Sequence, residues 1–248
     1  MFKSKKILAF IGARAGSKGL KDKNIIDFAG KPLIAWTIRA ARGSKYIDRT
    51  LVSTDGERIA AVAKEAGADV PFLRPTAIAQ DHSLIEEALD HALRWLKKNE
   101  KKSYDYIVLL QPTSPLRTTE EIDRALEHYF KMKKSAGDTL VSVTVAPAKL
   151  GWLMQKNKQG YIHFCLEKNR KKAQRQDVPE YYLPNGAIYI AATKNVIRAG
   201  FYGKQTMPFV MSEETSFDID SRQDLEKALE IFKKTNSARS EVERVQRN

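Results

Sequence analysis

The chain has 248 residues, of which 42% are hydrophobic and 29% are charged, enough for one large α/β domain with a smaller subdomain or for two small domains. Its single cysteine, Cys165, excludes an internal disulfide and any metal site built from several cysteines. The 43 basic and 30 acidic residues give a net charge of +13, but aromatic residues do not interleave with the basic runs, as a base-stacking surface would require. A polyanionic small molecule therefore explains the charge as well as a nucleic acid does.

Membrane and secretion signals are missing from the sequence. No apolar run approaches the roughly 18 residues that a membrane span requires. The first apolar run, Ile7 to Ile11, is too short for the core of a signal peptide, and a charged, glycine-containing loop follows it. Together with the single cysteine, these features predict a protein of the reducing cytoplasm.

The first half of the chain alternates between strand-like and helix-like segments. Apolar runs predict strands at residues 6–11, 49–54, 70–73, 106–110 and 139–145. Helical periodicity and capping patterns predict helices at residues 32–42, 57–66, 83–96 and 118–129. A predicted helix, 32–42, lies between the first and second strands, and another, 57–66, lies between the second and third. This order predicts right-handed crossovers and an α/β fold with a mainly parallel sheet.

The pattern changes between about residues 147 and 180, where helical periodicity is weak and a basic run occurs. We interpret this stretch as an insertion of hairpin-like pieces that extends from the sheet. Strand-like sequence returns at residues 187–190, and a last helix is predicted from Arg222 to about Lys234, with frayed polar residues after it. We therefore divide the chain into a core (1–146 and 181–236), an insertion (147–180) and a polar tail (237–248).

The loop after the first strand, Gly12 to Asn24, combines three glycines with four cations, which are Arg14, Lys18, Lys21 and Lys23. Glycines let backbone amides turn toward an anion, and a bound triphosphate would relieve the repulsion among the cations. The spacing matches neither the Walker A motif nor the dinucleotide-binding fingerprint. The loop is thus a candidate phosphate site, and a flexible solvated surface loop is the alternative.

A second loop follows the strand at residues 106–110 and reads Gln111 to Arg117, with two prolines that stiffen it. Gln111 offers both a donor and an acceptor, which suits a sugar or the edge of a base. The alternative is a rigid loop that only leads into a helix. In the same way, Asp55 at the end of another strand is either a ligand group or a helix cap.

The segment Phe217-Asp218-Ile219-Asp220 places two carboxylates on one face if its backbone is extended. Oxygen ligands at this spacing suit Mg²⁺, which also binds substrate phosphates. The metal would offset charge on a phosphate and help to position an attacking hydroxyl. The alternative is that Asp220 or Ser221 only caps the last helix.

Six short segments complete the pattern: Arg14-x-x-Ser17-Lys18-Gly19-x-x-x-Lys23-Asn24, Ser53-Thr54-Asp55, Gln111 to Arg117, Arg175-Gln176-Asp177, Asn185 to Tyr189, and Asp218-Ile219-Asp220. In this order they resemble the acylneuraminate cytidylyltransferases, also called CMP-sialic acid synthetases. The resemblance covers about residues 5 to 232. The related synthetase for the eight-carbon sugar Kdo has a different first loop. The pseudaminic-acid branch typically has Lys-Arg where this chain has Lys18-Gly19, so both match less well.

The resemblance implies a Rossmann-like nucleotidyltransferase fold whose insertion is exchanged between the subunits of a homodimer. The residues that match nucleotide-binding positions are Arg14, Ser17, Lys18, Lys23, Asn24, Arg74 and Ser83. The residues that match positions around the sugar are Gln111, Lys149, Arg175, Tyr189, Phe201 and Tyr202. Asp218 and Asp220 match the pair that binds Mg²⁺ or Mn²⁺. The implied catalytic residues are Arg14, Lys23 and Asp220.

The reaction that the resemblance implies is attack by the anomeric hydroxyl of a nine-carbon acidic keto sugar on the α-phosphorus of CTP, with release of pyrophosphate. N-acetylneuraminate or a close relative is the expected substrate, and legionaminic acid or deaminated sialic acid are alternatives. Two other hypotheses stay open: a nucleotidyltransferase that uses UTP or GTP, and a nucleic-acid-binding protein, which only the net charge favours.

Overall fold

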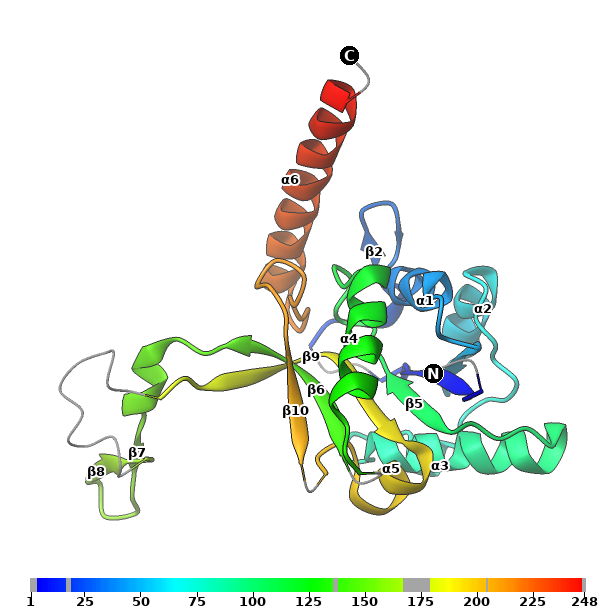
Figure 1. Cartoon of the computed structure of the whole chain (residues 1–248), viewed down its shortest axis with the longest axis horizontal. Helices are drawn as coiled ribbons and strands as arrows, with labels where there is room; N and C mark the ends of the chain where they lie inside the picture. Colours follow the sequence, from blue (N-terminus) through cyan, green and yellow to red (C-terminus); the bar gives the residue numbers. More distant parts are fainter. Residues whose placement is uncertain (1–3, 17–18, 136–137, 167–178, 204, 247–248) are drawn as a thin grey trace.

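A six-stranded sheet runs through the core of the molecule in the order β10-β6-β9-β5-β1-β4 (Figure 1). The computed structural model describes residues 4–16, 19–135, 138–166, 179–203 and 205–246, and only the backbone of 238–246. The strands of the sheet are β1 (Ile7–Gly12), β4 (Arg49–Ser53), β5 (Tyr106–Leu109), β6 (Thr139–Val145), β9 (Tyr182–Ala192) and β10 (Thr206–Val210).

The sheet is mainly parallel, which confirms the predicted fold class. β1 pairs in parallel with β4 and β5, and β6 pairs in parallel with β10. The exception is β9, which is antiparallel to both β5 and β6. The chain passes from β1 to β4 on one side and then returns to β5 on the other side of β1. In such sheets, ligands bind at the carboxyl ends of the strands where the order reverses.

Helices cover both faces of the sheet. The helices α1 (Leu33–Gly43), α2 (Glu57–Glu65) and α4 (Thr119–Met132) pack on one face, and α3 (Ile85–Trp95) and α5 (Thr193–Ala199) pack on the other. Alternate side chains of β1 serve the two faces: Ile7 and Ile11 pack toward α1 and α2, whereas Leu8 and Phe10 pack toward α3. The continuous apolar run of β1 thus reflects burial on both faces.

The last helix, α6 (Arg222–Gln246), starts against the hairpin of β2 (Asp27–Phe28) and β3 (Lys31–Pro32) and then projects away from the core (Figure 1). The predicted end near Lys234 is wrong, because no glycine or proline interrupts residues 235–246. Within the described residues, no helix combines the length and the apolar composition needed to cross a membrane.

An arm extends from the sheet where β6 and β9 continue to pair as far as Val145 and Tyr182 (Figure 1). Beyond this point, the chain forms a 3-10 turn (Ala148–Trp152) and a hairpin of β7 (Met154–Lys156) and β8 (Ile162–Phe164). The hairpin expected in the insertion is therefore present. Residues 167–178 of the insertion, including Arg175, lie outside the described residues.

Two local predictions are wrong. The strand predicted at residues 70–73 is missing, because only Asp69 forms an isolated bridge with Leu51 before the chain turns away. The capping box predicted from Ser83 is also missing, because α3 begins two residues later and the Ser83 hydroxyl accepts the N–H of Gln80 instead. The elements β2, β3, β10 and α5 have no counterpart in the sequence-based prediction.

The capping box predicted at the start of α4 is present, and it generates a test of stability. The Thr118 hydroxyl accepts the N–H of Glu121 at 3.2 Å, and the Glu121 carboxylate accepts the N–H of Thr118 at 2.9 Å. We predict that Thr118→Ala lowers the free energy of unfolding by about 1 kcal/mol in urea denaturation. Thr76→Ala, at an exposed threonine outside any helix cap of this kind, should change it by less than about 0.5 kcal/mol. Equal effects of the two variants would contradict the role of this cap.

Candidate active site

A pocket of about 520 Å³ lies at the carboxyl ends of β1 and β5, where the strand order reverses. Three segments that are distant in sequence form its walls: the loop after β1, the loop after β5, and the segment before α6. Its lining residues are Gly12, Arg14, Gly19, Lys23, Asn24, Ile85, Leu109, Leu110, Gln111, Pro112, Thr113, Asp218 and Asp220. The pocket thus brings together six of the residues that the sequence predicts for phosphates, metal and sugar, which are Arg14, Lys23, Asn24, Gln111, Asp218 and Asp220.

The described part of the loop after β1 is held in place by hydrogen bonds. Asn24 is buried, and its side-chain amide donates to the carbonyl of Arg14 at 2.9 Å. The N–H of Ala15 donates to the carboxylate of Asp55 at 2.9 Å, and the N–H of Ala13 donates to the carbonyl of Ser53 at 3.0 Å. Asp55 therefore fixes this loop rather than capping α2. These bonds argue against a flexible surface loop for the described residues.

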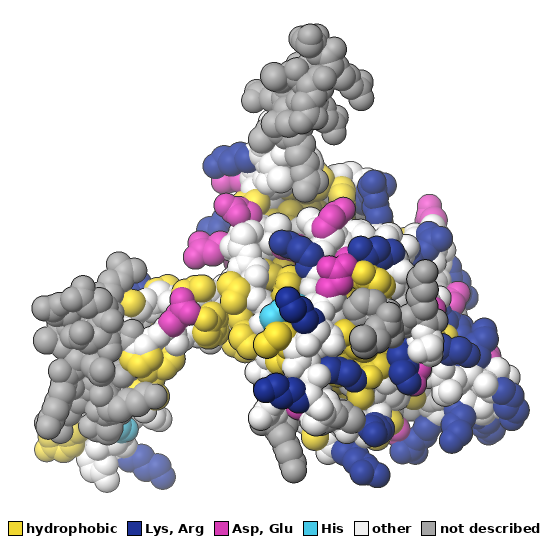
Figure 2. Space-filling view, in the orientation of Figure 1, with side chains coloured by type: hydrophobic (Ala, Val, Ile, Leu, Met, Phe, Trp, Pro, Cys, Tyr) yellow, Lys and Arg dark blue, Asp and Glu magenta, His cyan; other side chains and the backbone are white. Residues whose placement is uncertain are grey.

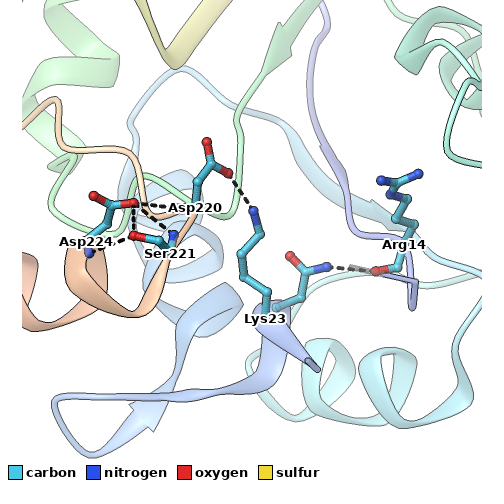
Figure 3. Close-up of polar contacts among 6 residues, drawn as sticks. Arg14, Lys23, Asp220, Ser221 and Asp224 are labelled. Carbon is cyan, nitrogen blue, oxygen red and sulfur yellow. Dashed lines mark hydrogen bonds and ion pairs between the residues drawn. The ribbon is translucent and has the colours of Figure 1, made fainter. Parts of the chain in front are cut away.

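Arg14 and Lys23 both stand at the pocket, but they have different partners. The Arg14 guanidinium binds the carboxylate of Asp81 at 2.7 Å and the carbonyl of Gln80 at 3.1 Å. The Lys23 ammonium instead binds the carboxylate of Asp220 at 2.8 Å across the pocket (Figure 3). The Lys23 side chain is 16% exposed and that of Asp220 is 74% exposed. An incoming phosphate would therefore meet a half-buried lysine that already holds a carboxylate.

Asp220 is not the cap of the last helix. Ser221 and Asp224 make a reciprocal cap, in which the Asp224 carboxylate accepts the N–H of Ser221 at 2.8 Å and the Ser221 hydroxyl accepts the N–H of Asp224 at 3.2 Å (Figure 3). The Asp220 side chain points to Lys23 instead. The capping alternative therefore applies to Ser221, and the Asp220 carboxylate faces the pocket.

Asp218 presents a buried carboxylate oxygen to the same pocket. Its Oδ1 atom is buried without a hydrogen-bond partner among the described residues. Burial raises the pKa of Asp218, and the nearby Asp220 carboxylate adds to this effect, while a hydrogen bond from Thr113 opposes it. Between the two aspartates, Ile219 is fully buried, and its N–H donates to the carbonyl of Thr113 at 2.9 Å. This bond anchors the aspartate segment to the loop after β5.

The two aspartates fit a divalent cation. They supply hard oxygen ligands on one side of the pocket, and the unpartnered oxygen of Asp218 lacks the donor that a buried carboxylate requires. Among the described residues, no group of three or more His, Cys, Asp or Glu side chains could hold a metal. A cation bound here would therefore take its remaining ligands from water or from a phosphate.

Of the other residues predicted for the nucleotide, the two that the structure describes, Arg74 and Ser83, are not among those that line this pocket. Arg74 is buried beside Gly12, where its Nε donates to the Ser53 hydroxyl at 3.0 Å and its Nη2 donates to the Ser53 carbonyl. Burial lowers the pKa of Arg74. Ser83 is half-buried, does not line the pocket, and binds Gln80. Ser17 and Lys18 lie outside the described residues.

Most of the residues predicted for the sugar do not line the pocket, with Gln111 as the exception. Tyr189 packs against Phe201 and Tyr202, with ring centroids 5.6 Å and 6.5 Å away. Phe201 is only 3% exposed and belongs to the core between the sheet and α3. Burial raises the pKa of Tyr189 to about 12. Lys149 is exposed on the 3-10 turn of the arm.

Several residues that line the pocket were not singled out from the sequence as ligand-binding residues, and Ile85 and Thr113 are two of them. Ile85 repeats with Leu89 and Leu93 at the spacing of an apolar helix face, so the sequence indicates only that Ile85 belongs to the core. Thr113 lies within the loop after β5, so its position in that loop was a usable signal. A Cβ at Gly12 would lie 2.3 Å from the Ile85 side chain, so Gly12 allows this close packing.

The chain is similar in sequence to several known proteins. A family model described as "Cytidylyltransferase" matches residues 8–244. An N-acylneuraminate cytidylyltransferase of Escherichia coli O18:K1:H7 is 36% identical over 93% of this chain, which spans about half (53%) of that protein's length. A CMP-N,N'-diacetyllegionaminic acid synthase of Legionella pneumophila is 39% identical over 87% of this chain and 91% of that protein. A pseudaminic acid cytidylyltransferase of Campylobacter jejuni is 32% identical over 92% of this chain and 97% of that protein.

The fold also matches that of a solved structure. The CMP:2-keto-3-deoxy-manno-octonic acid synthetase, solved in complex with CTP, superposes with a TM-score of 0.68 over 93% of this chain and 99% of that chain, at 16% identity. This superposition confirms the predicted Rossmann-like nucleotidyltransferase fold. The family model and the relatives confirm the family resemblance that the six sequence segments indicated. The chain belongs to the cytidylyltransferase family.

Proposed function

We propose that this protein transfers CMP from CTP to the anomeric hydroxyl of a nine-carbon acidic keto sugar and releases pyrophosphate. The observation that carries the proposal is the pocket that cations from the loop after β1 line together with the Asp218 and Asp220 carboxylates and with Gln111 from the loop after β5. The family supports the nucleotide, and relatives named for sialic, legionaminic and pseudaminic acids support the class of sugar.

The loop after β1 is proposed to hold the triphosphate. Arg14 and Lys23 would bind the β- and γ-phosphates and stabilise the charge that builds up on the leaving pyrophosphate. Ser17 and Lys18 belong to the same proposed site. Because Lys23 is only 16% exposed, its charge is poorly screened by water and acts strongly on a phosphate in the pocket. We assign the cytidine to the side of Asn24, Arg74 and Ser83.

Asp218 and Asp220 are proposed to bind Mg²⁺ or Mn²⁺. Such a cation offsets negative charge on the phosphates and helps to orient the attacking hydroxyl. Asp220 now pairs with Lys23 at 2.8 Å. When a cation takes Asp220, the Lys23 ammonium is free to bind phosphate oxygens, so the protein's own residues would match the charges of both substrates. Asp220 is therefore included among the catalytic residues with Arg14 and Lys23.

The sugar is assigned to Gln111 and to residues that come from outside the pocket of one chain. Lys149 and Arg175 belong to the insertion, so we propose that the arm of a second copy brings them to the sugar of the first. Hydrophobic side chains cover much of the arm (Figure 2), and those exposed on it include Val145, Leu153, Tyr161, Ile162, Tyr182 and Leu183. Burial of these side chains in a homodimer would remove an apolar surface from water. Tyr189, Phe201 and Tyr202 are proposed to shape the wall for the acyl group.

N-acetylneuraminate or a close relative is the proposed sugar, and N,N'-diacetyllegionaminic acid is the second candidate, which the 39% identical Legionella protein favours. Deaminated sialic acid differs only in the group that the aromatic residues would contact. We place the reaction in the cytoplasm, in line with the single cysteine. Neither a nucleic acid nor a membrane is among the proposed partners.

The first test measures pyrophosphate release by the purified protein with CTP, Mg²⁺ and a panel of acidic sugars. The panel contains N-acetylneuraminate, N,N'-diacetyllegionaminate, pseudaminate and deaminated sialic acid. Release is expected with CTP and with at least one of these sugars, and the preferred sugar identifies the substrate. Release only with UTP or GTP would contradict the choice of nucleotide. No release with any pair, together with tight salt-sensitive binding of DNA or RNA, would contradict the proposed function.

The second test measures Mn²⁺ binding in the presence of CTP by electron paramagnetic resonance of the free ion. Asp218→Asn keeps the shape of the side chain but removes its charge, so we expect the affinity for Mn²⁺ to fall by at least about tenfold. Asp224→Asn is the matched control, because Asp224 lies in the first turn of α6, close in sequence to Asp218, and its carboxylate caps that helix. The assignment to Asp218 would be refuted if both variants lost Mn²⁺ affinity equally, or if neither variant lost it.

The third test separates the two ends of the site by steady-state kinetics. Lys23→Ala should mainly lower kcat, because Lys23 stabilises charge on the leaving pyrophosphate. Arg175→Ala should mainly raise KM for the sugar, because Arg175 is assigned to its carboxylate end. Lys64→Ala, at an exposed lysine of α2, is the control for loss of a positive charge. Unchanged kinetics in both site variants would show that these assignments are wrong.

A further inference from the structure

Arg117 is a buried cation that the proposed function does not yet use. Only 2% of the residue is exposed, and no carboxylate oxygen among the described residues lies within ion-pair distance of its guanidinium. Burial lowers the pKa of Arg117 to about 9. A buried charge is costly in a protein core even when it is hydrogen-bonded, and an apolar side chain of similar volume would avoid that cost. The arginine therefore needs a reason other than packing.

The guanidinium of Arg117 joins three elements around one point. Its Nη1 donates to the carbonyl of Ala187 in β9 at 2.7 Å and to the carbonyl of Gln111 at 3.3 Å. Its Nη2 donates to the hydroxyl of Thr37 in α1 at 2.7 Å. The Thr37 hydroxyl in turn donates to the same Gln111 carbonyl at 3.3 Å. The backbone of Gln111 is thus held by two buried donors.

The side chain of Gln111 is held from the opposite direction by a bulge in β9. The pairing of β6 with β9 shifts register between Val141 and Val143, which pair with Tyr189 and Pro184, so Asn185 and Gly186 lie within the bulge. The Asn185 side-chain carbonyl accepts the Ser142 hydroxyl at 2.6 Å, which fixes the bulge. Gly186 has a φ of +75°, and a Cβ there would lie only 2.7 Å from Oε1 of Gln111. The amide of Gln111 therefore packs directly onto the glycine.

The contacts of Arg117 and of Gly186 both act on Gln111, which lines the pocket. Ala187, whose carbonyl binds Arg117, directly follows Gly186, so the arginine fixes both the loop that carries Gln111 and the strand on which its amide packs. A β-bulge next to a site commonly aims a side chain. We propose that Arg117 and Gly186 are positioning residues that fix the Gln111 amide, and with it the orientation in which the sugar is accepted. This inference rests on the proposed function for the assignment of Gln111 to the sugar.

The first test compares two glycines with the same backbone requirement. Gly186→Ala and Gly30→Ala both place a side chain at positive φ, +75° and +81°, but a Cβ at Gly30 has no neighbour within 4 Å. We expect Gly186→Ala to raise KM for the sugar about tenfold or more, with KM for CTP changed less than about twofold. Gly30→Ala should change neither. Equal rises of both KM values in Gly186→Ala would overturn the inference.

The second test changes the arginine. Arg117→Lys replaces the planar fork by a single donor nitrogen, which cannot reproduce the separate contacts of Nη1 and Nη2, so it should raise KM for the sugar and not for CTP. Arg49→Met is the control for a lost structural arginine, because Arg49 binds Glu100 and Asp69 at the far edge of the sheet. It should lower Tm without changing KM for the sugar. If Arg117→Lys does not fold, Thr37→Val removes one hydroxyl of the same network and should give the same kinetic pattern in weaker form.

A third measurement reads the position of Gln111 without any turnover. The NMR signals of its side-chain NH2 group, assigned by their loss in Gln111→Glu, should shift or broaden in Arg117→Lys and Gly186→Ala and stay unchanged in Arg49→Met and Gly30→Ala. Unchanged signals in all four variants would overturn the inference. If the signals respond but the wild-type protein releases no pyrophosphate with any sugar, the positioning roles stand and the proposed function fails.

Discussion

The ion pair between Lys23 and Asp220 is the contact on which the pocket depends. It joins the loop after the first strand to the segment before the last helix, across 197 residues of sequence. Each partner is held in place by its own surroundings, since Asn24 ties the loop to Arg14 and Ile219 ties the aspartate segment to Thr113. The pair brings a cation and a carboxylate together where a triphosphate and a metal ion would need them apart. Binding of both ligands would therefore be favoured together, because each takes one partner of the pair.

Local sequence predicted the parts of the fold that local interactions determine. The apolar run of β1 and the capping box of Thr118 and Glu121 both form as expected, because burial on two faces and a reciprocal cap are encoded by neighbouring residues. The strand at 70–73 failed, because apolar composition does not say whether a partner strand lies alongside. The reversed direction of β9 was also unpredicted, since it depends on where the chain re-enters the sheet after the arm.

The candidate site shows the same division. Arg14, Lys23 and Gln111 could be predicted, because each lies in a loop that follows a buried strand, and the two aspartates could be predicted from their alternate spacing. Arg117 could not be assigned a role from sequence, because it contacts carbonyl groups in β9 and in the loop after β5, which are distant from each other in the chain. The aromatic residues predicted to contact the sugar agree least with the structure, because none of them lines the pocket. Phe201 has an aromatic side chain suited to a pocket, yet the fold buries it in the core.

Labelled CTP can show whether the protein transfers the CMP unit, with its α-phosphorus, to the sugar. Two samples of CTP, one with radioactive phosphorus at the α position and one at the γ position, are incubated with the protein, Mg²⁺ and the sugar panel. If the protein transfers CMP, we expect the α label in the sugar product and the γ label in pyrophosphate. A γ label in the sugar would indicate transfer of the terminal phosphoryl group, and a γ label in inorganic phosphate would indicate hydrolysis. Either result would show that the protein does not transfer CMP to the sugar.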